Sequence, residues 1–122
     1  MSLSAEEKAH LSTEAALDKK ASHVVLLDVR RTSSFTDYFL ICSGSSDRQV
    51  QTIADAIDES LGKRGIAALG VEGYQEARWV LMDYGDLVIH IFQEETRRYY
   101  DLERLWGSAA QLPTPQGSPV QP

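Results

Sequence analysis

Asp83 and Asp86 are the acidic side chains whose type and spacing come nearest to a metal site. Enzymes that hold two divalent cations use paired carboxylates, and a pair at i and i+2 of a strand projects from one face. Asp83 and Asp86 are three positions apart, so they could meet only across the mouth of a hairpin. Asp28 has Arg30, not a carboxylate, two positions later. We therefore predict no metal site and expect both hairpin aspartates to cap the turn, as aspartate often does.

The Gly44-Ser45 connector is a second candidate for chemistry, because a glycine-containing loop between a strand and a helix can hold a phosphate on the helix amides. It lacks the lysine of a P-loop and the glycine spacing of a dinucleotide-binding loop. The same short connector is also needed simply to turn from the strand into the helix. Nucleotidyltransferases combine such a Gly-Ser with carboxylates on a later strand, so a metal-dependent enzyme of that type stays an alternative. Calorimetry with nucleotide and magnesium would test it.

The other side chains with catalytic potential are dispersed along the chain. His10, His23 and His90 show no metal-ligand spacing. Cys42 is the single cysteine and lies within an apolar run, which predicts a buried, inert thiol and excludes an internal disulfide. His90 is better explained as a packing partner of Trp79 across a hairpin than as a general base. These residues therefore show no catalytic group with a partner, and we expect no cofactor; the metal-dependent enzyme named above stays the alternative.

The charge balance favours a basic partner. The chain has 122 residues, enough for one domain with a core, a net charge of −6 and a pI near 4.9. An acidic domain is repelled by nucleic-acid phosphates but can bind a basic protein, including one on a ribonucleoprotein; the alternative is that the acidity only aids solubility. Lysine and arginine pairs are scattered, without interleaved aromatics, so direct sequence-specific binding of nucleic acid is not expected.

No targeting segment is evident. No apolar run approaches the roughly 20 residues of a membrane span. The first ten residues are acidic and polar, unlike a secretory signal or an arginine-rich transit peptide. We therefore expect a cytoplasmic protein with no membrane partner.

The rest of the chain is organised around a hairpin in the stretch Gly73–Trp106. The apolar runs Trp79–Asp83 and Asp86–Phe92 flank Tyr84-Gly85, which has the glycine that a tight hairpin turn favours. This turn predicts the following pairs of opposed residues: Asp83 and Asp86, Leu81 and Val88, Trp79 and His90.

Side chains of a strand alternate between the two faces of a sheet, so the hairpin has two distinct faces. One face is aliphatic and predicts the core: Val80, Met82, Leu87, Ile89 and Ile91. The other mixes large apolar groups with polar ones: Trp79, Leu81, Asp83, Asp86, Val88, His90 and Phe92. This mixed face is core if a helix covers it, and an aromatic protein-binding surface rimmed with acids if it is open. The sequence leaves both alternatives open.

The hairpin requires further elements to cover its aliphatic face. A capping box at Ser4–Glu7 begins a helix expected to end near Ala21, and Ser46 caps a second helix with a regular apolar stripe. The expected strands are Val24–Val29, Tyr38–Ser43, Ile66–Val71 and the two hairpin strands, and a last helix covers Glu94–Trp106, with Arg97 on its solvent side. The order helix, strand, strand, helix, three strands, helix predicts an α/β (α+β) fold with a mixed sheet of about five strands and helices packed on it.

The composition changes after Trp106. The segment from Gly107 holds all four prolines and no charged residue, so it cannot form a core. We expect one domain over residues 1–106 and a proline-rich disordered tail over residues 107–122.

The order of several motifs resembles that of one known family, the ribosomal silencing factor family, also called RsfS or Iojap. The resemblance covers about residues 5–106, and the motifs that carry it are Thr36-Asp37-Tyr38-Phe39, Cys42-Ser43-Gly44-Ser45-Ser46, Gly70-Val71-Glu72-Gly73, Trp79–Asp86, Val88–Phe92 and Arg98–Trp106. It implies a nucleotidyltransferase-like fold without the active site, and therefore a protein that is not an enzyme. It also implies a translational repressor that binds the large ribosomal subunit through its protein fourteen, blocks joining of the small subunit, and forms homodimers when free.

The resemblance places candidate partner contacts on and around the hairpin: Glu72, Tyr74, Trp79, Met82, Asp83, Tyr84 and Asp86. Met82 also belongs to the aliphatic face, so its assignment as a contact conflicts with the face analysis. A module that only forms homodimers through the Trp79 face is a further alternative, which light scattering combined with a ribosome pull-down would separate from ribosome binding.

Overall fold

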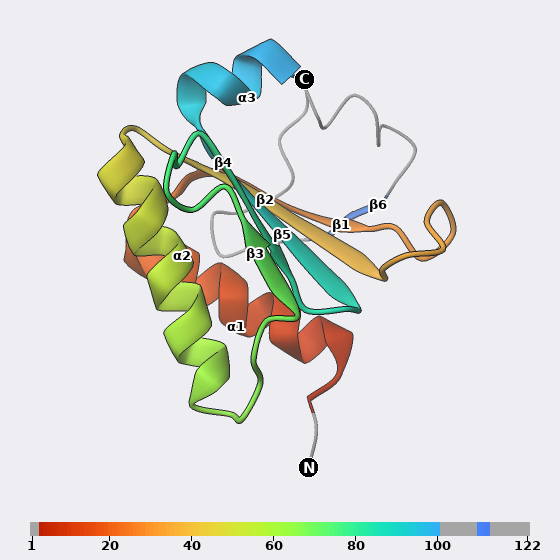
Figure 1. Cartoon of the computed structure of the whole chain (residues 1–122). Helices are drawn as coiled ribbons and strands as arrows, with labels where there is room; N and C mark the ends of the chain where they lie inside the picture. Colours follow the sequence, from red (N-terminus) through yellow and green to blue (C-terminus); the bar gives the residue numbers. More distant parts are fainter. Residues whose placement is uncertain (1–2, 101–109, 113–122) are drawn as a thin grey trace.

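The computed structural model describes residues 3–100 and 110–112. Its elements are α1 (Ala5–Asp18), β1 (Ser22–Asp28), β2 (Tyr38–Gly44), α2 (Asp47–Gly62), β3 (Gly70–Glu72), β4 (Trp79–Asp83), β5 (Leu87–Gln93), α3 (Glu94–Tyr100) and β6 (Ala110–Leu112). The strands form one sheet in the order β3-β4-β5-β2-β1-β6 (Figure 1). Among the described strands, only β2 and β5 are parallel neighbours, and the other pairs are antiparallel. The predicted α/β class, mixed sheet and order of elements are confirmed up to α3.

Helices α1 and α2 pack on the same face of the sheet and close the larger of two hydrophobic cores (Figure 1). The α2 stripe predicted from the sequence is buried: Val50, Ile53, Ala54, Ile57 and Leu61. Helix α1 buries small side chains, Ala9, Ser12, Thr13 and Ala16, whereas Leu11, Ala15 and Leu17 lie only partly buried. Small side chains allow the helix backbone to approach its neighbours closely.

The hairpin turn is one residue later than predicted. Trp79 pairs with Phe92, Leu81 with His90 and Asp83 with Val88, and the Tyr84 amide donates to the Leu87 carbonyl (2.9 Å). The loop is therefore Gly85-Asp86, with Gly85 first at a φ of 87°. Glycine adopts this left-handed conformation without steric cost, and a primed turn needs it at the first loop position.

The new register preserves the faces of the hairpin, because each partner shifts by two residues. The aliphatic face is confirmed as core, with Val80, Met82, Leu87, Ile89 and Ile91 all at most 1% exposed. On the opposite face of the sheet a second, smaller core contains Leu27, Val29, Phe39, Ile41 and Phe92.

Two strands differ from the prediction. Strand β3 is only Gly70–Glu72, not Ile66–Val71. The sheet has six strands, because Ala110–Leu112 pairs with β1 as β6. The expected disorder from Gly107 onward is therefore wrong for these three residues, since pairing with β1 supplies their backbone groups with partners. The rest of that segment lies outside the described residues, and the boundary at residue 106 stays a prediction.

Arg97 of α3 is the main departure from the expected helix faces. It was expected on the solvent side, but it is buried and donates hydrogen bonds to the His23 carbonyl and to Ser43 Oγ. Buried guanidinium groups are tolerated when their donors are paired, and these acceptors lie on β1 and β2. The side chains of the expected helix from Tyr99 to Trp106 lie outside the described part.

Candidate functional site

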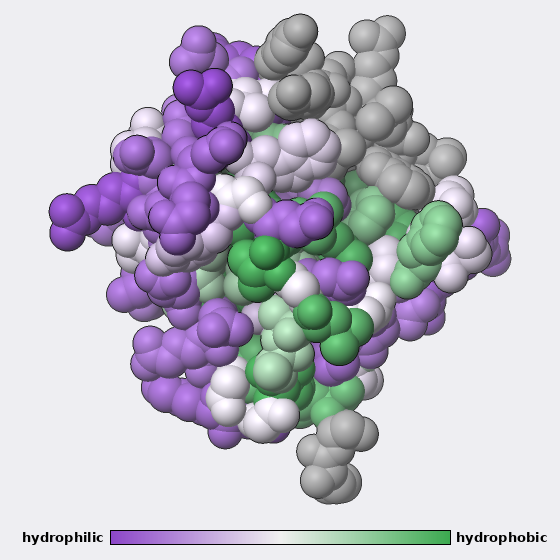
Figure 2. All heavy atoms as spheres, viewed as in Figure 1, coloured by the Kyte–Doolittle hydropathy of each residue, from purple (hydrophilic) through white to green (hydrophobic). Residues whose placement is uncertain are grey.

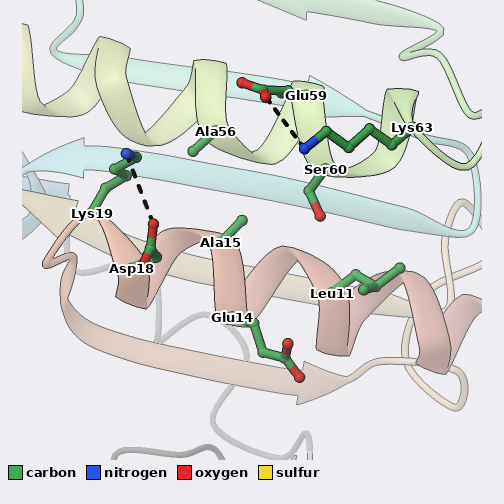
Figure 3. Close-up of a pocket in the computed structure, with 9 residues that line it drawn as sticks. All are labelled: Leu11, Glu14, Ala15, Asp18, Lys19, Ala56, Glu59, Ser60 and Lys63. Atoms are coloured by element: carbon green, nitrogen blue, oxygen red, sulfur yellow. Dashed lines mark ion pairs between the residues drawn. The ribbon is translucent and has the colours of Figure 1, made fainter.

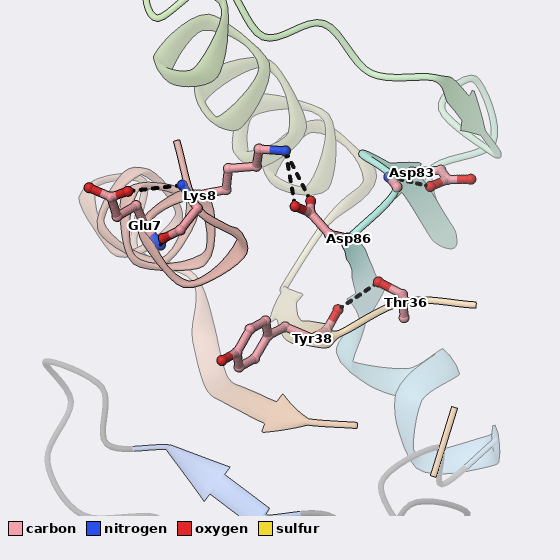
Figure 4. A network of polar contacts seen from close by, with 8 residues as sticks. Glu7, Lys8, Thr36, Tyr38, Asp83 and Asp86 are labelled. Atoms are coloured by element: carbon pink, nitrogen blue, oxygen red, sulfur yellow. Dashed lines mark hydrogen bonds and ion pairs between the residues drawn. The ribbon is translucent and has the colours of Figure 1, made fainter. Parts of the chain in front are cut away.

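The two turn aspartates have separate partners. Asp86 pairs with Lys8 of α1, with Nζ–Oδ1 and Nζ–Oδ2 distances of 3.0 and 3.3 Å. Asp83 accepts a hydrogen bond from the Gly85 amide (2.8 Å), so it caps the turn as predicted. Figure 4 shows the two carboxylates pointing away from each other. Among the described residues, no group of three or more His, Cys, Asp or Glu could hold a metal ion.

The predicted position of Asp86 on the same face as Trp79 is wrong. Its position in the loop frees it from the strand alternation, and its carboxylate turns toward α1, on the other side of the sheet (Figure 4). The side chain is 34% exposed. The prediction that Asp86 contacts a partner therefore applies to a carboxylate that is already paired with Lys8.

Trp79 belongs to an aromatic cluster on the face opposite α1 and α2. Its indole stacks on Phe92 with ring centroids 4.9 Å apart, and its Nε1–H donates to His90 Nδ1 (3.0 Å). The His90 ring meets the Phe39 ring edge-on, with centroids 5.1 Å apart. Trp79 and His90 are thus in contact, as predicted, although they are diagonal neighbours rather than opposed residues.

Burial gives His90 the electrostatics of a core residue. The side chain is 6% exposed, and burial lowers its pKa to about 4. A ring with so low a pKa is a weak base, and its burial keeps it from a substrate, so both features support the packing role over a general-base role. Because Nδ1 accepts from the indole, the ring proton must be on Nε2, which is buried and has no hydrogen-bond partner among the described residues.

The mixed face is neither fully open nor fully covered. His90 and Phe92 are buried, whereas Trp79, Leu81, Asp83 and Val88 keep part of their surface exposed. On the neighbouring strand, Glu72 pairs with Leu81 and is exposed. We define the outer hairpin surface as Glu72, Trp79, Leu81, Asp83 and Val88. Apolar side chains at the centre and carboxylates beside them give it the composition of a protein-binding surface.

The three other predicted contacts, Met82, Tyr84 and Tyr74, lie beneath or beside the hairpin. Met82 is 1% exposed and Tyr84 is 5% exposed, so these two predicted contacts have almost no surface to offer a partner. The Tyr84 hydroxyl donates to Asp58 of α2 (3.2 Å), and burial is the main cause of its raised pKa. Tyr74 is half-buried and donates to Asp55 of the same helix (2.9 Å). Both tyrosines therefore tie this region to α2.

Two exposed apolar residues beside the hairpin were not predicted from the sequence. Leu69 is 76% exposed and Val71 is 45% exposed. Val71 lies on β3, an edge strand that pairs only with β4 among the described strands. Figure 2 shows hydrophobic atoms on the face where β3 runs in Figure 1. Leu69 and Val71 alternate with Gly70 and Glu72, but this alternation was a weak signal in the sequence, because a three-residue edge strand has too few positions to show a pattern.

The surface also has two hollows among the described residues, one beside the hairpin and one between the helices. One, of about 630 Å³, borders Trp79 and is lined by Gly73, Glu76, Arg78, Trp79, Gln93, Glu95 and Thr96. The other, of about 410 Å³, is a groove between α1 and α2 (Figure 3). Ion pairs line the groove, Lys19 with Asp18 (3.8 Å) and Lys63 with Glu59 (3.5 Å). Because these charges are paired within each helix, the groove has little free charge to attract a ligand.

Similarity to known proteins agrees with this geometry. The family described as "Ribosomal silencing factor during starvation" matches residues 2–121. A ribosomal silencing factor from Bacillus subtilis is 48% identical over 81% of this chain and 84% of its own length, and one from Halalkalibacterium halodurans is 46% identical over 88% and 92%. A crystal structure of a Chromobacterium violaceum protein is 32% identical and superposes with a TM-score of 0.84, over 98% of each chain.

The chain belongs to the ribosomal silencing factor family. The family resemblance inferred from the sequence is confirmed, and with it the mixed α/β fold. The nucleotidyltransferase-like description of this fold stays a prediction. Within residues 3–100 and 110–112, no helix is long and apolar enough to span a membrane.

Proposed function

We propose that this protein is a cytoplasmic, non-catalytic repressor of translation that acts by steric exclusion. It binds the large ribosomal subunit through ribosomal protein fourteen of that subunit, and the bound domain occupies space that the small subunit needs for joining. The membership of the chain in a family of ribosomal silencing factors supports the ribosomal role. The partner protein and the steric mechanism are the parts that need a test.

The observation that carries the proposal is the outer hairpin surface. Trp79 keeps an exposed part while its ring is fixed against Phe92 and His90, and Glu72 and Asp83 place carboxylates on the same side of the sheet. Partly buried tryptophans are frequent binding hot spots, and nearby carboxylates favour a basic partner. The net charge of −6 adds long-range attraction to such a partner.

Co-sedimentation with purified large subunits tests the site. We expect Trp79→Ala to weaken binding by about 2 kcal/mol, or about thirtyfold, because the anchor and its packed surface are lost. Phe35→Ala is the matched control: Phe35 is an aromatic residue that is 91% exposed, on the loop between β1 and β2. Unchanged binding by folded Trp79→Ala protein would remove Trp79 from the interface.

A subunit-joining experiment tests the mechanism. Purified large subunits are incubated with this protein before small subunits are added, and sucrose gradients report the fraction of joined ribosomes. We expect fewer joined ribosomes, in proportion to occupancy of the large subunit. If the protein co-sediments with ribosomes that have joined normally, the steric mechanism is wrong even though binding is real.

We also propose that the free protein forms a homodimer. The exposed edge of β3, with Leu69 and Val71 beside it, favours pairing with another strand. Light scattering should give twice the mass of one chain. Val71→Lys places a charge on this edge and should yield a monomer if the edge is the dimer contact.

A further inference from the structure

Burying His90 costs folding free energy, and the packing of its ring does not explain why a histidine stands at this position. Its ring is 6% exposed, and within residues 3–100 and 110–112 its Nε2–H has no hydrogen-bond partner. A buried, unpaired N–H loses its bond to water and gains nothing in return. A hydrophobic residue of similar size would avoid this loss, so folding stability alone does not account for a histidine at this position.

The imidazole supplies one hydrogen-bond acceptor at a fixed position. Nδ1 lies 3.0 Å from Trp79 Nε1 and accepts the indole proton. The ring cannot turn freely, because Phe39 meets it edge-on and Phe92 lies nearly parallel to it, with an angle of 13° between the planes. The acceptor therefore points at the indole in one direction only.

The indole is in turn held at two of its surfaces. Phe92 stacks on its face, with centroids 4.9 Å apart, and His90 binds its polar edge. Stacking alone allows an indole to slide or turn in its own plane, whereas a hydrogen bond from Nε1 restricts that turn. The exposed part of Trp79 is thus presented in one orientation, which lowers the entropy that a partner must remove on binding.

We propose that His90 is a positioning residue for partner binding: through its hydrogen bond it holds the Trp79 indole in the orientation that the partner recognises. This inference rests on the proposed function, in which Trp79 is a contact for a basic ribosomal protein. His90 itself, being buried, does not touch the partner.

Two variants of similar size separate positioning from packing. His90→Leu keeps an apolar side chain but removes the acceptor. His90→Gln keeps a side-chain carbonyl that can accept the indole proton. We expect the Leu variant to unfold at the same or a higher temperature than the wild type, and to bind large subunits about fivefold to tenfold more weakly. The Gln variant should bind within about twofold of wild type, since the orientation is restored.

The indole Nε1–H signal in NMR spectra reports the orientation directly. The signal of Trp79, assigned with Trp79→Phe, should move upfield and broaden in the Leu variant and return toward its wild-type position in the Gln variant. A merely structural role for His90 would instead lower the unfolding temperature of the Leu variant without a selective change at this signal.

The outcomes distinguish this inference from the function on which it rests. If Trp79→Ala abolishes binding but folded His90→Leu binds like wild type, the positioning role is wrong and the proposed surface stands. If both the Leu and the Gln variants lose binding equally, the acceptor is not what matters and the inference is overturned. If Trp79→Ala binds normally, the contact role of Trp79 fails, and the positioning role fails with it.

Discussion

The Lys8 ammonium of α1 and the Asp86 carboxylate of the β4–β5 turn form an ion pair of 3.0 Å between residues 78 positions apart. The side chains are 15% and 34% exposed, so the pair is partly shielded from water. It fastens the first helix to the tip of the hairpin (Figure 4). An ion pair in such a position stabilises the fold more than one on the open surface.

Lys8→Met should therefore lower the free energy of unfolding by about 1 kcal/mol, because Asp86 loses its partner while the aliphatic part of the side chain is kept. Urea denaturation measures the change. Lys63→Met is the control, since Lys63 pairs with Glu59 at 3.5 Å but both side chains are more than 70% exposed. Its effect should stay below about 0.5 kcal/mol. Equal effects would show that the Lys8 pair is no stronger than a surface pair.

Gly73→Ala should be among the most destabilising single-methyl additions in this chain. Gly73 has a φ of 80°, and an added Cβ would lie 2.2 Å from the Trp79 carbonyl oxygen. We expect a loss of about 3 kcal/mol, from backbone strain and from displacement of the strand that carries Trp79. Thermal unfolding followed by circular dichroism measures it.

Gly62→Ala is the control for Gly73→Ala. Gly62 ends α2, and an added Cβ would meet nothing within 4 Å. Alanine favours helix more than glycine does, so this variant should be unchanged or more stable by up to about 1 kcal/mol. If Gly73→Ala matched the control, the close approach to Trp79 would not be rigid.

Arg97→Met tests the buried guanidinium of α3. Its hydrogen bonds to the His23 carbonyl and Ser43 Oγ join α3 to β1 and β2, and methionine can fill the space but cannot donate. We expect a loss of about 2 kcal/mol in the free energy of unfolding. Arg98→Met, one position later and exposed, should change it by less than about 0.5 kcal/mol. A small effect of Arg97→Met would mean that water replaces the guanidinium at little cost.

Local patterns in the sequence were enough to predict most of the fold. The apolar spacing of α2 and its Ser46 cap follow from helix geometry, and both are observed. The two faces of the hairpin follow from strand alternation, which survives an error of one residue in the turn. The turn itself was misplaced because Tyr84-Gly85 and Gly85-Asp86 are both acceptable two-residue loops. The strand pairing decides between them, and the local sequence does not contain it.

The features that the sequence could not reveal depend on distant residues. Arg97 looks like a solvent-facing residue of an amphipathic helix, but it is buried against acceptors that include the His23 carbonyl and Ser43 Oγ, 74 and 54 positions away. The Asp86 carboxylate turns away from Trp79 because it forms an ion pair with Lys8 on α1. Strand β6 exists through its pairing with β1. Within the candidate site, the shared face of Trp79, Leu81 and Val88 was predicted correctly, but the position of Asp86 and the exposed fraction of each side chain required the packed structure.

The buried His90 predicts a specific dependence of stability on pH. Burial lowers its pKa in the folded state to about 4, from an ordinary value of 6.5. Between these values the unfolded chain binds a proton that the folded chain does not, so stability falls as the pH decreases from 6.5 to 4 and this contribution levels off below 4. The full loss from this residue is about 3 kcal/mol. Urea titrations of wild type and His90→Leu at several pH values measure it, because the carboxylates contribute equally to both and cancel in the difference. The advantage of the Leu variant should grow steadily from pH 6.5 to 4; a constant difference would show that His90 is already solvated in the folded protein.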